Sequence, residues 1–135
     1  MKSITLNASV ESISRITEFV DEALEALHCP MKVQMQIDLA IDELFSNISY
    51  YAYQKGIGTA TVSVDFDPET RTVSLIFEDN GIPYNPLEKE DPDITLSAKE
   101  RKVGGLGIFL VKKTMDSMEY ERRDDRNIVT IRKKI

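Results

Sequence analysis

The chain of 135 residues carries a formal charge of −6 and is 41% hydrophobic and 30% charged, which is typical of one soluble globular domain over residues 1–135. No apolar run approaches the roughly 20 residues needed to span a bilayer, so no membrane association is expected. The acidic balance argues against direct nucleic-acid binding, which depends on Lys and Arg. Cys29 is the single cysteine, so no internal disulfide is expected and a cytoplasmic location is predicted.

The first thirty residues predict a short strand followed by an amphipathic helix. Alternating apolar and polar residues predict a strand over 3–8, and helical spacing predicts a helix from Val10 to about Leu27. Ser9 is placed to cap this helix. Pro30 favours the start of a second helix, because proline is tolerated in a first helical turn.

The second helix has the clearest pattern in the chain and is expected to continue to about residue 54 or 55. Its apolar face consists of residues three and four apart, namely Val33, Ile37, Ala40, Ile41, Leu44, Ile48 and Tyr51. Glu43 and Asn47 lie one turn apart at the edge of that face. Taken alone, they are interpreted either as an exposed helix pair or as part of a site.

The second half of the chain predicts two hairpins separated by a loop and a helix. Strands are predicted over 61–66 and 72–77 and again over 117–122 and 127–132. Residues 82–104 carry three prolines and many charges, which indicates a long functional loop, and a glycine-rich turn then opens a helix over 108–115. This order of elements predicts an α/β (α+β) two-layer sandwich, with helices on one face of a mixed, mostly antiparallel sheet.

Two glycine-containing turns carry the candidate chemistry. Gly104, Gly105 and Gly107 precede or open a helix, where backbone N–H groups and the helix dipole favour an anion. Asp79 at a strand end is able to accept a hydrogen bond from an amino group such as that of adenine, and Gly81 leaves room for the ring. Each turn also has an ordinary interpretation, because Asp and Gly are common turn residues.

The joint order of these motifs resembles a known family. The chain is similar to the small anti-sigma regulatory factors with serine/threonine kinase activity, members of the ATPase superfamily of gyrase, Hsp90, histidine kinases and MutL (GHKL). Residues 41–47 resemble the N box of that superfamily, residues 78–81 its first glycine box and residues 104–111 its second. Residues 127–131 resemble its terminal strand. The resemblance implies a Bergerat-type ATP-binding fold that uses ATP and Mg²⁺.

The resemblance also implies roles for individual residues around the phosphates. Asn47 would coordinate Mg²⁺, and Glu43 would be the general base for a partner serine or threonine. Gly105 and Gly107 would contribute N–H groups to the phosphates. A loop cation, Arg101 or Lys102, would offset charge on the γ-phosphate.

Around the base, the resemblance implies that Asp79 reads the adenine amino group, that Gly81 contacts the ring and that Thr130 lies near the adenine. The implied partners are a sigma factor and an anti-anti-sigma protein of the STAS type, and the implied assembly is a homodimer. Two alternatives stay open: a nucleotide-responsive protein-binding module without kinase activity, and an interaction domain that binds no nucleotide.

Overall fold

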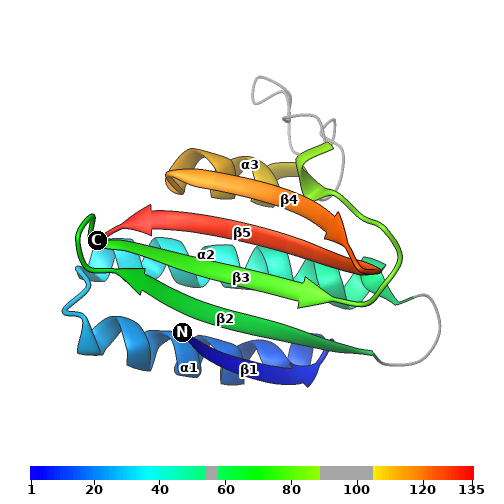
Figure 1. Ribbon diagram of the computed structural model, residues 1–135, viewed down its shortest axis with the longest axis horizontal. Helices are drawn as coiled ribbons and strands as arrows, with labels where there is room; N and C mark the ends of the chain where they lie inside the picture. The colour runs from blue at the N-terminus through cyan, green and yellow to red at the C-terminus, as the bar shows by residue number, and fades with distance from the viewer. Residues whose placement is uncertain (54–57, 89–104) are drawn as a thin grey trace.

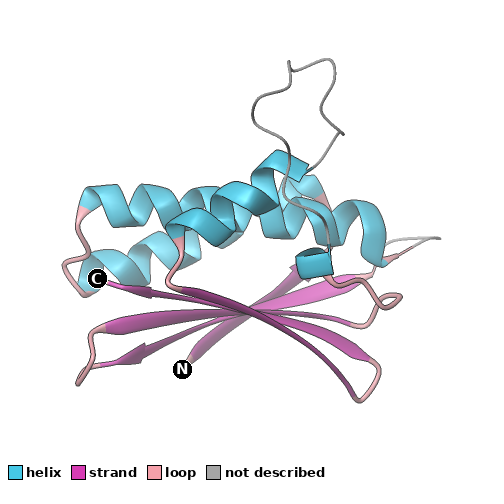
Figure 2. Ribbon diagram, turned by 90° about the horizontal axis from the view of Figure 1, so that it is seen from above, coloured by secondary structure: helices cyan, strands magenta, loops and turns pink. Residues whose placement is uncertain are grey.

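The computed structural model describes residues 1–53, 58–88 and 105–135 as two layers, with a five-stranded sheet covered on one face by helices (Figures 1 and 2). The expected two-layer fold class is confirmed. The elements are β1 (Lys2–Asn7), a 3₁₀ turn (Val10–Ser12), α1 (Ile13–Ala26), α2 (Met31–Asn47), a π-helical turn η2 (Ile48–Ala52), β2 (Thr59–Asp67), β3 (Thr72–Asp79), η3 (Pro86–Glu88), α3 (Gly105–Thr114), β4 (Ser117–Arg123) and β5 (Arg126–Lys134).

The strand order is β1-β2-β3-β5-β4, and every described pair of neighbours is antiparallel. The tight turn between β4 and β5 places Asp124 and Asp125 at positive φ, 53° and 61°, the conformation of a type I′ hairpin. Because side chains alternate along a strand, one set of residues faces the helices and the other faces solvent. The β3–β5 register pairs Phe77 with Val129 and Asp79 with Asn127 on the helix-facing side.

The core lies between the helices and this inner face of the sheet. Its largest fully buried side chains include Phe45 of α2 and Phe77 of β3. The apolar spacing of α1 and α2 explains this arrangement, because each helix presents one stripe to the sheet. The fully buried members of the stripes are Ile16, Val20 and Leu24 on α1 and Ile37, Ala40, Ile41 and Phe45 on α2.

The ends of the helices differ from the sequence-based expectation. The α-helix of α2 ends at Asn47 and continues as the π-turn η2, where a longer α-helix was predicted. The predicted stop near residues 54 and 55 lies outside the described residues. The Ser9 side chain makes no capping hydrogen bond, although the Ser9 carbonyl accepts from the Ser12 N–H at 3.0 Å. A π-turn commonly marks a functional site, so the end of α2 is of interest.

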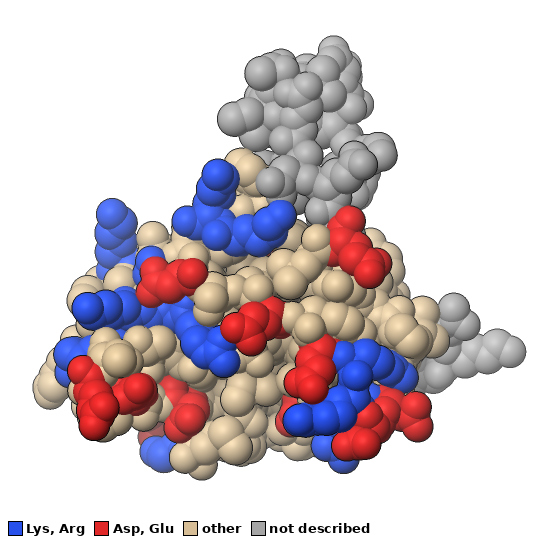
Figure 3. Space-filling view, turned by 45° about the horizontal axis from the view of Figure 1, so that its top comes forward, with Lys and Arg blue, Asp and Glu red and all other residues tan. Residues whose placement is uncertain are grey.

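Charged side chains of both signs are interspersed over the face shown in Figure 3. The described part of the chain contains no apolar helix of the length that a membrane span requires.

Candidate nucleotide site

A small cavity lies where the C-terminal end of α2 meets the ends of β3 and β5. Its water-accessible space is about 20 Å³, room for about one water molecule. Apolar side chains form most of the wall, and three polar side chains, all buried, enter it from three elements. The lining residues are Leu44, Asn47, Ile48, Ala52, Phe77, Asp79, Tyr84, Pro86, Asn127 and Val129.

Asp79 ends β3 with its side chain buried at 6% exposure. Its Oδ1 accepts hydrogen bonds from the Gly81 N–H and from Asn127 Nδ2, each at 2.9 Å. Burial raises the pKa of this carboxyl, while the two hydrogen bonds and the nearby Arg122 guanidinium act in the opposite direction. The arrangement holds a buried acceptor at the cavity wall, as an amino-group reader requires.

Gly81 is the point where the segment after β3 touches the end of α2. A Cβ on Gly81 would collide with the backbone carbonyl of Ala52, which cannot move away cheaply. The neighbouring Ile82 N–H donates to the same Ala52 carbonyl at 2.8 Å. The absence of a side chain at Gly81 therefore allows the π-turn η2 and the strand end to close one wall of the site.

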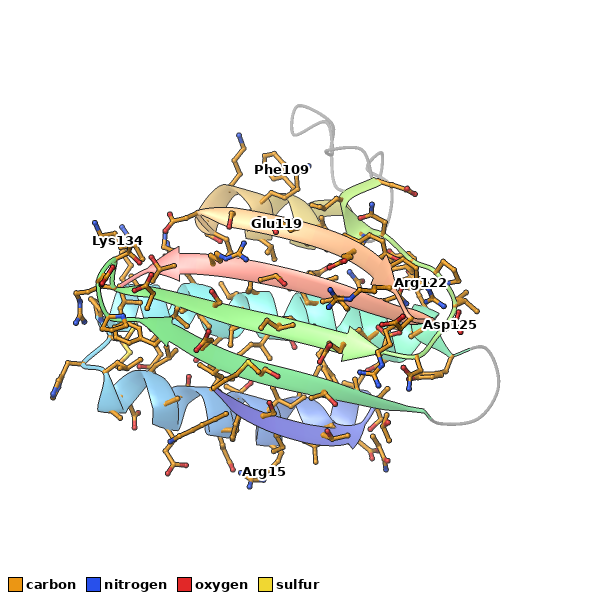
Figure 4. The ribbon with its side chains drawn as sticks, in the orientation of Figure 1. Arg15, Phe109, Glu119, Arg122, Asp125 and Lys134 are labelled. Carbon is orange, nitrogen blue, oxygen red and sulfur yellow. The ribbon has the colours of Figure 1, made fainter. Side chains whose placement is uncertain are left out.

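Arg122 of β4 supports the same wall from the neighbouring strand. Its Nη1 donates to the Gly81 carbonyl at 2.8 Å, and the residue lies at the end of β4 beside the segment that follows β3 (Figure 4). The guanidinium thus fixes the backbone at Gly81 and brings a positive charge close to Asp79.

Asn47 occupies the last α-helical position before η2 and is 8% exposed. Its amide Nδ2 is buried and has no hydrogen-bond partner among the described residues. An unpaired buried amide N–H is costly, and its placement at a cavity suggests that an acceptor atom of a ligand satisfies it. Rotating the amide by 180° would present the carbonyl oxygen instead, which suits Mg²⁺.

Glu43 lies one helical turn before Asn47 and is half-buried. Its carboxylate lies directly against Gly107 in the first turn of α3, where a Cβ would collide with both carboxylate oxygens. Gly105 is the first residue of the same helix. The structure therefore brings Glu43 to the N-terminal turn of α3, where free N–H groups and the helix dipole favour negative charge.

Thr130 is not brought to the cavity. In the β5 register it pairs with Ile76, on the solvent-facing side of the sheet, whereas Asn127 and Val129 point to the helix side and line the cavity. Alternation along a strand puts residues 127 and 130 on opposite faces, so the placement corrects the expectation for Thr130. Asn127 of β5 lines the cavity wall where Thr130 was expected. The sequence could have indicated this, because Asn127 is a polar residue at an inward position of a strand whose other inward residues, Val129 and Ile131, are apolar.

The two cations expected to meet the γ-phosphate, Arg101 and Lys102, lie outside the described residues. No group of three or more His, Cys, Asp or Glu side chains within residues 1–53, 58–88 and 105–135 is arranged to hold a metal ion. A phosphate-bound Mg²⁺ does not need such a group, because it keeps waters and phosphate oxygens as most of its ligands. The unpaired Asn47 amide and the buried Asp79 acceptor, both at the cavity, fit a Mg²⁺-bound nucleotide.

Comparison with known proteins gives the same family from two directions. Residues 6–133 match the family described as the histidine kinase-like ATPase domain. The chain is also 30% identical over 100 residues to the serine/threonine-protein kinase BtrW of Bordetella bronchiseptica, a match that covers 74% of this chain and 70% of that protein. The chain is a member of the histidine kinase-like ATPase domain family.

Proposed function

We propose that this protein is an ATP-dependent serine/threonine protein kinase that phosphorylates an anti-anti-sigma partner of the STAS type and sequesters a sigma factor when unopposed. The family supports the ATP-binding part of the proposal, and the name of the relative supports the kinase part. The sigma factor, the STAS-type partner, a homodimeric assembly and a cytoplasmic location are parts of the proposal that follow from the resemblance of the motifs.

The observation that carries the proposal is the convergence of three motifs on one place. Asn47 and Asp79 come from different elements, α2 and β3, and line the same cavity. Glu43 does not line the cavity itself, but it lies one helical turn before Asn47 on α2 and contacts Gly107 of α3. An exposed helix pair would explain neither the burial of Asn47 nor its unpaired amide.

Each residue then has a distinct role. Asp79 would accept a hydrogen bond from the adenine amino group, and Asn47 would hold the Mg²⁺, which neutralises phosphate charge when bound. Glu43 would accept the proton from the serine or threonine hydroxyl of the partner as that hydroxyl attacks the γ-phosphate. Gly105 and Gly107 would offer backbone N–H groups to the phosphates.

Nucleotide entry also requires the wall at Tyr84 and Pro86 to move outward. The water-accessible space of about 20 Å³ is far below the roughly 300 Å³ of the smallest usual ligand pockets. The Tyr84 ring stacks on Tyr51 with centroids 5.0 Å apart, so the wall has a packed partner on η2. We therefore expect ATP binding to displace the Tyr84 and Pro86 side chains from η2, while the backbone at Ile82 and Tyr84 keeps its hydrogen bonds to Asn127.

The decisive experiment combines γ-labelled ATP, Mg²⁺ and a purified STAS-type partner with the wild-type chain and with Glu43→Gln. The variant should transfer phosphate at least about 100-fold more slowly, because a general base contributes roughly 10²–10⁴-fold. Its ATP affinity, measured by calorimetry, should stay within about threefold of the wild type, because Gln keeps the size of the side chain. Glu22→Gln, an exposed change on α1, is the matched control.

Transfer by Glu43→Gln at the wild-type rate would remove Glu43 as the base. A wild-type chain that binds ATP but labels no partner would instead support the nucleotide-responsive binding module. A wild-type chain that binds no ATP would contradict the proposal as a whole.

A further inference from the structure

The side-chain amide of Asn127 has every hydrogen-bonding position filled. Its Nδ2 donates to Asp79 Oδ1 at 2.9 Å and to the Ile82 carbonyl at 2.7 Å. Its Oδ1 accepts from the Tyr84 N–H at 3.2 Å and from the Tyr120 hydroxyl at 2.6 Å. A side-chain amide offers two N–H donors and two lone pairs. Asn127 therefore has no hydrogen bond left for a ligand, although it lines the cavity.

The backbone fixes which end of this amide carries the nitrogen. The Ile82 carbonyl only accepts, and the Tyr84 N–H only donates, so a flipped amide would face acceptor with acceptor and donor with donor. Asn127 is 3% exposed, so water does not replace the lost bonds. The amide must then present an N–H, never an oxygen, to Asp79.

Within the described part of the chain, both donors that reach the Asp79 carboxylate arrive at the same oxygen. The Gly81 N–H and Asn127 Nδ2 each donate to Oδ1, and neither donates to Oδ2. Because these two donors come from different strand ends, they fix the rotation of the carboxylate about its Cβ–Cγ bond. The orientation of the second oxygen, Oδ2, thus depends on Asn127, with the Tyr120 hydroxyl behind it, together with the Gly81 N–H.

We infer that Asn127, supported by Tyr120, is a positioning residue that holds Asp79 so that one fixed carboxylate oxygen accepts from the nucleobase. The preference of the site for an amino or a carbonyl group on the purine then depends on Asn127. This inference rests on the proposed function, because it assigns the specificity of the same site. Asn127 does not touch the base through a hydrogen bond and acts through Asp79.

The inference predicts a changed nucleotide preference for the Asp79→Asn variant. The donors from Gly81 and Asn127 would hold the new amide oxygen in the Oδ1 position, so its NH₂ group would face the cavity. That group repels the 6-amino group of adenine and pairs with the 6-carbonyl of hypoxanthine. The variant should therefore reverse the preference of the site from ATP to inosine triphosphate, as long as Asn127 is present.

The test is a double-mutant cycle of Asp79→Asn and Asn127→Ala, with affinities for MgATP and Mg-inosine triphosphate measured by calorimetry. We expect about a tenfold preference for ATP in the wild type, a reversal in Asp79→Asn, and a loss of most of that reversal when Asn127→Ala is added. Asn7→Ala, an exposed change at the end of β1, should leave both affinities unchanged.

Tyr120→Phe gives a second route that leaves the Asn127 side chain in place, should Asn127→Ala fail to fold. In the Asp79→Asn background it should weaken the reversal by about threefold, whereas Tyr50→Phe, the same change on an exposed ring, should not alter it. An Asp79→Asn chain with the same preference with or without Asn127, or with or without the Tyr120 hydroxyl, would overturn the inference. A wild-type chain that binds neither nucleotide would overturn the proposed function.

Discussion

Two aspartates, Asp79 in the cavity and Asp38 on α2, are both shielded from water but have different neighbours. Burial is the largest cause that raises the pKa of both carboxyls. At Asp79 the partners are donors and a cation, which favour the charged form. At Asp38 the partner is a second carboxyl, Asp21 of α1, and the pKa of Asp38 rises to about 7.

A proton on Asp38 would account for the carboxyl pair between α1 and α2. Asp21 Oδ1 and Asp38 Oδ1 are both buried and have no donor among the described residues. A proton held between the two oxygens would satisfy both and would remove the like-charge repulsion. Burial alone therefore does not decide the charge of an acid. The neighbours favour the charged form at Asp79 and the neutral form at Asp38.

The largest expected effect comes from removing the charge at Asp79. Asp79→Asn should lower ATP affinity by about 2 kcal/mol, roughly 30-fold, because a hydrogen bond to a charged acceptor is lost and an NH₂ group replaces it. The midpoint of thermal unfolding should not fall, since the amide oxygen still accepts from Gly81 and Asn127 and no buried charge remains. Calorimetry and thermal denaturation measure the two quantities on the same sample.

An unchanged ATP affinity would remove Asp79 as the reader of the base. A large drop in thermal stability would show that its charge supports the fold, contrary to the contrast with Asp38.

The sequence was sufficient to predict the position of Asp79 at a strand end, but not the proximity of Asp21 and Asp38. Asp79 ends a clearly alternating strand and is followed by Gly81, so its place at a strand end follows from local pattern. Asp21 and Asp38 lie on different helices, and neither helix alone shows which face meets the other. Their proximity depends on the packing of α1 against α2, which periodicity does not specify.

The same limit applies to the ends of the inner strands β3 and β5. Alternation predicts the strands, and the two-layer class follows from the order of elements. Which residues of β5 reach the cavity depends on register, and the register places Asn127 opposite Asp79 while Thr130 pairs with Ile76 on the other face. The end of α2 as a π-turn at residues 48–52 depends on contacts with the segment after β3, which lies thirty residues away in sequence.

A smaller effect, a gain in stability and not a loss of affinity, is expected when one carboxyl of the Asp21–Asp38 pair is replaced. The folded chain binds the shared proton more tightly than the unfolded chain, where the pKa of Asp38 is near 3.8. Between about pH 4 and pH 7 the native state therefore holds more protons, and its stability should fall as the pH rises through this window. Asp38→Asn should remove this dependence and, at pH 8, increase stability by about 1 kcal/mol, because the amide donates to Asp21 without a proton.

Urea unfolding at pH 5 and pH 8 measures this difference. Asp42→Asn, a change at an exposed position of the same helix, is the matched control and should leave the pH dependence intact. Parallel stability curves for the wild type and Asp38→Asn across this range would show that the two carboxyls share no proton.

The smallest effect should come from Arg122, which contributes only one of the influences on Asp79. Arg122→Gln keeps a donor for the Gly81 carbonyl but removes the positive charge that lowers the pKa of Asp79, so that pKa should rise further. ATP affinity should fall by about threefold at pH 7.5 and by more at lower pH, because Asp79 becomes protonated earlier on acidification. Arg123→Gln, an exposed change next in sequence, is the control. Equal losses at pH 6 and pH 8 would show that Arg122 acts through its hydrogen bond to Gly81 and not through its charge.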